Sequence, residues 1–80
     1  MRFAVTWTPS AEQDLADLWL NASDRDAVRA AADEIDARLQ RNPLHEGQAR
    51  ANPTRILHVP PLAVLFDVSV PDRLVNVWAV

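Results

Sequence analysis

The strongest constraint on the fold is a set of three short apolar runs near the C-terminal end, which prolines separate. The runs cover residues 54–59, 62–68 and 74–80, with Pro60-Pro61 and Pro71-Asp72 between them. Because proline has no N–H to donate to a strand ladder, it belongs at strand ends and in turns. The sequence therefore predicts three strands joined by two turns, with a hairpin at Pro60-Pro61.

The second run shows which of its faces is buried. Alternate residues of a strand point to opposite faces. One face of this run is apolar throughout, with Leu62, Val64, Phe66 and Val68. The other face carries Ala63, Leu65, Asp67 and Ser69. We expect the first set to face the core, under helices. In the first and third runs both faces are apolar, so their pattern does not choose a face.

The N-terminal residues predict a strand followed by a helix. Residues 2–7 alternate, with Phe3, Val5 and Trp7 on one side, which is typical of a half-buried strand. Thr8-Pro9-Ser10 then fits a helix start, since proline is tolerated in the first turn. Thr8 or Ser10 could be the N-cap, and Ser10 with Gln13 also fits a capping box.

Two apolar stripes at helical spacing follow. The first consists of Ala11, Leu15, Leu18, Trp19 and Ala22, and the second of Val28, Ala31, Ala32, Ile35 and Leu39. Residues 21–24 interrupt the pattern, and Ser23 or Asp24 can cap the second helix. Asn42-Pro43 ends it. We expect a helical hairpin, a loop over residues 45–53, and Trp7 and Trp19 in the core. The order β-α-α-β-β-β indicates one α+β domain over residues 1–80.

Composition excludes several classes of protein. The 80 residues contain no cysteine, and the two histidines are not closely spaced, so neither a disulfide nor a zinc site is expected. We expect no cofactor. No apolar run approaches the length of a membrane span, and the N-terminus is too short and too polar for a signal peptide, so we expect a soluble cytoplasmic protein. The net charge of −3 counts against a strong nucleic-acid binder.

Several segments, in this order, carry a resemblance to a known family. They are WTPSAEQDLADLW, with Ala11, Asp14 and Leu15, then RNPLHEGQAR, RILHVPPLAVLFDV and DRLVNVWAV. Over nearly its whole length the chain resembles the RelE/ParE superfamily, the toxins of bacterial type II toxin–antitoxin systems. The resemblance implies an antiparallel sheet with a helical hairpin packed on one face. It also implies a cognate antitoxin as partner, with a segment that wraps the toxin.

The resemblance leaves the activity open. RelE-like members cut messenger RNA on the ribosome, whereas ParE-like members poison DNA gyrase without being nucleases. The target could therefore be the ribosome or DNA gyrase. Arg55 lies where one cation of the nucleases would sit. The Tyr-Arg-like pair of the nucleases falls at Leu62-Ala63, and neither residue can do that work. Their C-terminal catalytic segment has no counterpart before Val80. We therefore expect most of the nuclease residues to be missing.

Five residues are candidates for function, each with a structural alternative. Arg55 and His58 are the catalytic candidates, although His58 could be an ordinary exposed or hydrogen-bonded strand residue. The binding candidates are Arg50, Arg55, Arg73 and Trp78. Arg55 and Arg50 could instead be solvated or form a surface salt bridge. Arg73 beside Asp72 is typical of a turn, and Trp78 could be a core residue.

Three hypotheses follow from the sequence. The first is a toxin that a cognate antitoxin neutralises and that acts by binding a protein. The second is an enzyme, a reduced ribosome-dependent messenger RNA endoribonuclease that uses Arg50, Arg55 and His58. The third is a non-toxic relict or assembly module of the same fold, which could form a homodimer through exposed strand edges.

Overall fold

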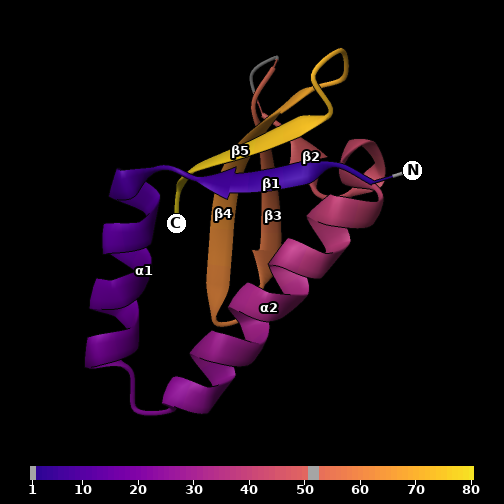
Figure 1. Ribbon diagram of the computed structural model, residues 1–80. Coiled ribbons are helices and arrows are strands. Elements are labelled where there is room, and N and C mark those ends of the chain that lie inside the picture. The colour runs from indigo at the N-terminus through magenta and orange to yellow at the C-terminus, as the bar shows by residue number, and fades with distance from the viewer. Residues whose placement is uncertain (1, 51–52) are drawn as a thin grey trace.

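The fold is a sheet of five strands with a hairpin of two helices against one face (Figure 1). This computed structural model describes residues 2–50 and 53–80. The elements in chain order are β1 (Ala4–Trp7), α1 (Pro9–Asn21), α2 (Arg25–Arg41), the 3-10 helix η1 (Pro43–His45), β2 (Gln48–Ala49), β3 (Arg55–Val59), β4 (Leu62–Ser69) and β5 (Leu74–Ala79). The expected α+β class, with a helical hairpin on one face, is confirmed.

The sheet has the strand order β1-β5-β4-β3-β2. The pairs β2–β3, β3–β4 and β4–β5 are antiparallel, as expected for the last two pairs. The N-terminal strand differs, because β1 pairs with β5 in parallel. A parallel pair needs a long connection between its strands, and the helices and the three following strands provide it. The sheet is therefore mixed, which corrects the expectation of a wholly antiparallel one.

Side-chain caps fix both helix starts. The Thr8 hydroxyl oxygen accepts a hydrogen bond from the Ala11 N–H at 3.1 Å, so Thr8 caps α1. Asp24 caps α2 in the same way, because its carboxylate accepts from the Ala27 N–H at 3.0 Å. Each satisfies a backbone donor that has no partner within its helix. Ser10, the alternative cap, lies inside the first turn of α1.

The core lies between α2 and the sheet. The expected α2 stripe is buried, except that Ala32 is half-buried, and the expected face of β4 is buried except for half-buried Val68. Trp7 and Trp19, both expected in the core, pack against it but are only half-buried. In α1 only Ala11 is fully buried, and Leu18 keeps 44% of its surface exposed. The apolar stripe of α1 is thus incompletely covered.

The segment expected as a loop contains two short elements. The helix η1 extends to His45, and β2 pairs with β3 through Gln48 and Ala49. Two residues are too few to show a period in the sequence, so β2 could not be predicted from pattern. Residues 51–52 of the expected loop lie outside the described residues.

The connection between β3 and β4 is the expected turn at Pro60-Pro61, and the peptide bond between these prolines is cis. None of the helices in the described ranges is long and apolar enough to cross a membrane.

Candidate functional site

Arg55 is held on the helix-covered side of the sheet. Its neighbour across the ladder is Phe66, a core residue. The Arg55 guanidinium donates from Nε to the carbonyl oxygen of Glu46 at 3.0 Å and from a terminal nitrogen to that of Gly47 at 3.2 Å. These bonds join the segment before β2 to β3. The structure therefore gives the Arg55 side chain a structural role.

His58 lies on the opposite face from Arg55. It stands across from Ala63 in the ladder and is exposed. Residues three positions apart in a strand point to opposite sides, so β3 cannot bring these two side chains together. Within the described part of the chain, the His58 side chain makes no hydrogen bond or ion pair with another side chain.

Arg50 lies in the segment between β2 and β3, Arg73 lies in the turn between β4 and β5, and both residues are exposed. The Arg50 N–H donates to the carbonyl oxygen of Thr54 at 3.0 Å, which closes the segment before β3. Arg73 has a φ of 49°, and its carbonyl oxygen accepts the N–H of Ala4 at 2.9 Å. Its backbone therefore anchors β1, as expected of a turn residue.

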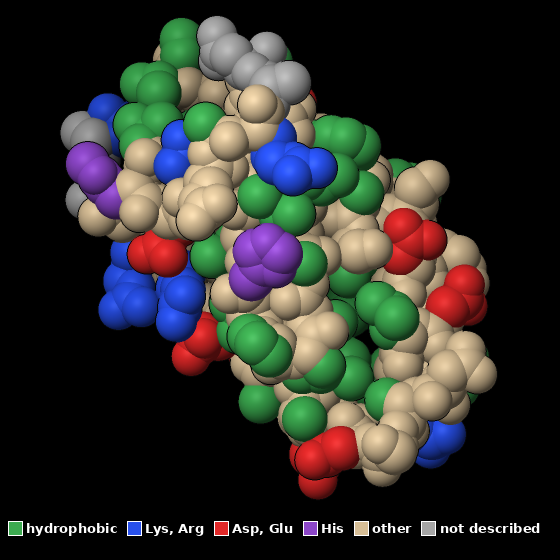
Figure 2. Space-filling model, turned by 180° about the vertical axis from the view of Figure 1, so that it is seen from behind, with side chains coloured by type: hydrophobic (Ala, Val, Ile, Leu, Met, Phe, Trp, Pro, Cys, Tyr) green, Lys and Arg blue, Asp and Glu red, His purple; other side chains and the backbone are tan. Residues whose placement is uncertain are grey.

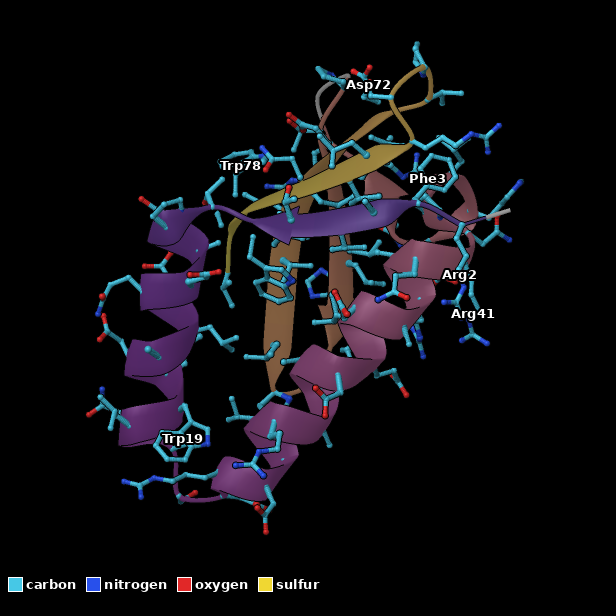
Figure 3. All side chains as sticks on the ribbon, in the orientation of Figure 1. Arg2, Phe3, Trp19, Arg41, Asp72 and Trp78 are labelled. Atoms are coloured by element: carbon cyan, nitrogen blue, oxygen red, sulfur yellow. The ribbon has the colours of Figure 1, made fainter. Side chains whose placement is uncertain are left out.

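Trp78 is the exposed aromatic residue of β5. The register with β4 shifts beside it, because Phe66 pairs with Val77 while Leu65 pairs with Ala79. Trp78 is the extra residue of this β-bulge, a feature that redirects side chains. Its side chain remains accessible, since 38% of the residue surface is exposed. Figure 3 shows it at the C-terminal end of β5, far from Trp19 at the tip of the helical hairpin.

Asp67 fixes the orientation of Trp78. One carboxylate oxygen of Asp67 accepts from the indole N–H of Trp78 at 3.3 Å and from the hydroxyl of Thr54 at 3.1 Å. The sequence placed Asp67 on the face away from the core but did not link it to Trp78. Leu65 lies two residues earlier on the same face, and Ile56 stands across from it in β3. We call the set Ile56, Leu65, Asp67 and Trp78 the open face.

A hollow lies between the helical hairpin and the hairpin of β3 and β4. It has a volume of about 560 Å³. Its lining includes Leu18 of α1, Ala22 just after that helix, Val28 of α2 and the Pro60-Pro61 turn. We call it the hairpin groove, and Figure 2 shows hydrophobic side chains around this hollow, seen from behind. Asn21, Ser23 and Asp24 add polar groups at the tip of the helical hairpin. The sequence placed Leu18 on the apolar stripe of the first helix and Pro60-Pro61 in a turn. It did not predict that Leu18 would face a groove.

Within the described ranges, no group of three or more His, Cys, Asp or Glu side chains could hold a metal ion. The two catalytic candidates lie on opposite faces of one strand, while the hairpin groove and the open face each expose apolar side chains.

Comparison with known proteins agrees with this fold. The RelBE2 toxin–antitoxin complex from Mycobacterium tuberculosis contains a chain with a TM-score of 0.76 and 22% identity, covering 96% of this chain and 93% of that one. The chromosomal ParDE system from P. aeruginosa gives a TM-score of 0.75 and 16% identity, with 98% and 92% covered. No curated protein sequence matches the chain. A family model described as the ParE toxin of the type II toxin–antitoxin system parDE matches residues 5–80. Since this match covers almost the whole chain, the protein belongs to the ParE toxin family.

Proposed function

We propose that a cognate antitoxin neutralises this toxin by binding in the hairpin groove, and that the toxin acts by binding a protein target, not by cutting RNA. The observation that carries the second part is the placement of Arg55. Its guanidinium is engaged by two loop carbonyls, and His58 lies on the other face of the sheet.

RNA cleavage through the 2′-hydroxyl needs groups that converge on one phosphate. A base takes the hydroxyl proton, an acid protonates the leaving oxygen, and cations stabilise the charge that develops. Arg55 and His58 cannot reach the same phosphate from opposite faces of one strand. This geometry favours a toxin that works by contact.

The hairpin groove supports an antitoxin as its occupant. A volume of about 560 Å³ lies in the range of protein pockets that hold a ligand group. Leu18 lines the groove and is 44% exposed, so a partner would cover apolar surface that water now contacts. The similar folds were solved as toxin–antitoxin systems, which supports the same kind of partner here.

The open face supports a protein as the target. Trp78 is an exposed tryptophan whose indole is oriented by Asp67, and such aromatic anchors often carry the energy of an interface. The described strand residues on this face include no arginine, and a phosphate backbone is bound chiefly through Lys and Arg.

Growth of a bacterial host after induced expression tests this proposal. The chain is expressed alone and together with the adjacent small reading frame, which would encode the antitoxin. We expect growth arrest by the chain alone and relief by its neighbour. His58→Ala should leave arrest intact, because this side chain is exposed and makes no bond that the fold needs. Trp78→Ala should weaken arrest while the antitoxin still co-purifies.

Arg55→Ala is a further arm that requires a stability control. Removing its guanidinium leaves two loop carbonyls without a donor, at a cost of about 1–3 kcal/mol. Growth is therefore compared at a temperature at which thermal unfolding shows the variant to be folded. Persisting arrest agrees with action by binding. Loss of arrest in both folded Arg55→Ala and His58→Ala would support the ribonuclease instead.

The target class is tested separately. DNA supercoiling by purified gyrase and translation-dependent cleavage of messenger RNA are measured with the same protein preparation. We expect no RNA cleavage, and inhibition of supercoiling would identify gyrase. A folded chain that causes no arrest would contradict the toxin proposal and favour the relict or assembly module.

A further inference from the structure

The strand β1 is an edge of the sheet, and its outer side is available for pairing. β1 is the first strand in the order β1-β5-β4-β3-β2. Natural edge strands are usually protected by charges, prolines, bulges or very short length. The opposite edge follows this rule, because β2 has two residues. The β1 sequence AVTW has no charge, no proline and no register shift against β5.

The direction of each backbone group in β1 follows from its pairing. The N–H of Ala4 donates to the Arg73 carbonyl and the N–H of Thr8 to the Val77 carbonyl, both at 2.9 Å. Alternate residues of a strand direct their N–H and C=O groups to the same side, so Ala4, Thr6 and Thr8 face β5. The N–H and C=O groups of Val5 and Trp7 then face outward from the sheet.

The end of α2 limits how far this free edge extends. The Phe3 N–H also faces outward, and it donates to the carbonyl oxygen of Gln40 at 2.9 Å. Beyond Trp7 the chain enters α1. Only Val5 and Trp7 therefore offer outward backbone groups, and both residues have half-buried side chains that pack against the core.

We propose that β1 pairs antiparallel with β1 of a second copy of this chain, about a two-fold axis at Thr6. This register uses all the outward groups, since Val5 of each copy exchanges two hydrogen bonds with Trp7 of the other. Each symmetric interface of this kind is self-complementary. The two sheets become continuous, and both helical hairpins lie on the same side. The inference goes beyond the proposed toxin function and does not depend on it.

Charge and packing favour a second copy as the occupant. In this register Arg2 lies near the first turn of α1 of the other copy, and that turn contains Glu12. Arg2 and Arg41 flank the Phe3–Gln40 bond and lie at one corner in Figure 3. The ion pairs among the described residues all involve Arg38, so these two arginines have no acidic partner there. The second copy would bring an acid to Arg2 and cover Val5 and Trp7.

Cysteine crosslinking tests the register. The chain has no cysteine of its own, so an introduced thiol is unique. Thr6 would meet its symmetry mate in a non-hydrogen-bonded pair, where Cα atoms are about 4.5 Å apart, within the range of a disulfide. Under mild oxidation we expect Thr6→Cys to give a disulfide-linked dimer. Ala4→Cys, exposed and on the same face of the same strand, would not meet its own copy and should stay monomeric.

Charged substitutions at Thr6 give a second test, which measures dimer dissociation and does not require a covalent bond. Like charges directly opposite on paired strands destabilise the pair. Thr6→Asp and Thr6→Lys should each raise the dimer dissociation constant by up to about fivefold in sedimentation experiments, and mixing them should restore a dimer. Circular dichroism of each variant shows that the monomer fold is retained.

Two outcomes would overturn the proposal. One is equal crosslinking of the Thr6→Cys and Ala4→Cys chains, which would show random collision. The other is a monomer at all concentrations without a Thr6→Cys crosslink. If the amides of Val5 and Trp7 then became protected from hydrogen exchange only with antitoxin bound, the outer side of β1 would be a binding site for the antitoxin and not for a second copy.

Discussion

At the scale of single residues, Gly47 holds a conformation that most residues avoid. Its φ is +70°, and a Cβ atom there would collide with the backbone carbonyl oxygen of Ile56. The Gly47 carbonyl also accepts a hydrogen bond from Arg55. Glycine is therefore required both for the turn and for the close approach of β3.

We predict that Gly47→Ala lowers the free energy of unfolding by about 2 kcal/mol or more, because the substitution adds both a strained φ and a steric clash. Urea unfolding followed by circular dichroism measures the change. Gln48→Ala is the matched control, since Gln48 is exposed in the next position and should change stability by less than about 0.5 kcal/mol. Equal effects of the two substitutions would refute this role of Gly47.

The placement of Arg55 and His58 on opposite faces follows from their spacing in the sequence. Once 54–59 is accepted as a strand, period two places residues three apart on opposite faces. The sequence thus contained enough information to separate the catalytic candidates. It did not contain the carbonyl partners of Arg55, because Glu46 and Gly47 meet β3 only in the folded chain.

At the scale of elements, the helix caps resolve choices that the sequence left open. Thr8 and Ser10 both fit the start of the first helix, as do Ser23 and Asp24 for the second. The structure selects Thr8 and Asp24. Selection depends on which residue has extended backbone angles just before the helix, and composition alone does not report those angles.

We predict that Thr8→Ala and Asp24→Ala each lower the free energy of unfolding by about 1 kcal/mol, the usual cost of losing an N-cap. Ser10→Ala and Ser23→Ala serve as paired controls and should be nearly neutral. Thermal or urea unfolding of the four variants decides between the positions. A larger loss for either serine than for its neighbouring cap would show that the helix begins elsewhere.

At the scale of the whole molecule, the hairpin groove arises because α1 covers the sheet less fully than α2 does. Ala11 is the fully buried residue of α1, while Leu18 remains exposed and lines the same hollow as the Pro60-Pro61 turn. The cation–π contact of Arg25 with Trp19, at 4.7 Å, braces the tip of the helical hairpin. The groove is thus formed jointly by the tip of the helical hairpin and the Pro60-Pro61 turn, and neither hairpin forms it alone.

We predict that Leu18→Asp weakens antitoxin binding by at least about tenfold, because it places a carboxylate in an apolar groove that the partner would cover. Leu20→Asp is the control, since Leu20 is 58% exposed and does not line the groove. Calorimetric titration with the purified antitoxin measures both. Both leucines are largely exposed, so neither change should unfold the toxin. Equal weakening by the two variants would place the antitoxin elsewhere.

The sequence by itself determined the local features of this protein. Its periods and prolines predict the two helices, four of the five strands and the core face of β4, because each of these signals lies within a few consecutive residues. The tertiary structure alone decided the strand order, the parallel pairing of β1 with β5, the short strand β2 and the hairpin groove. These features depend on contacts between residues far apart in the chain, and no local period encodes which distant segments will meet.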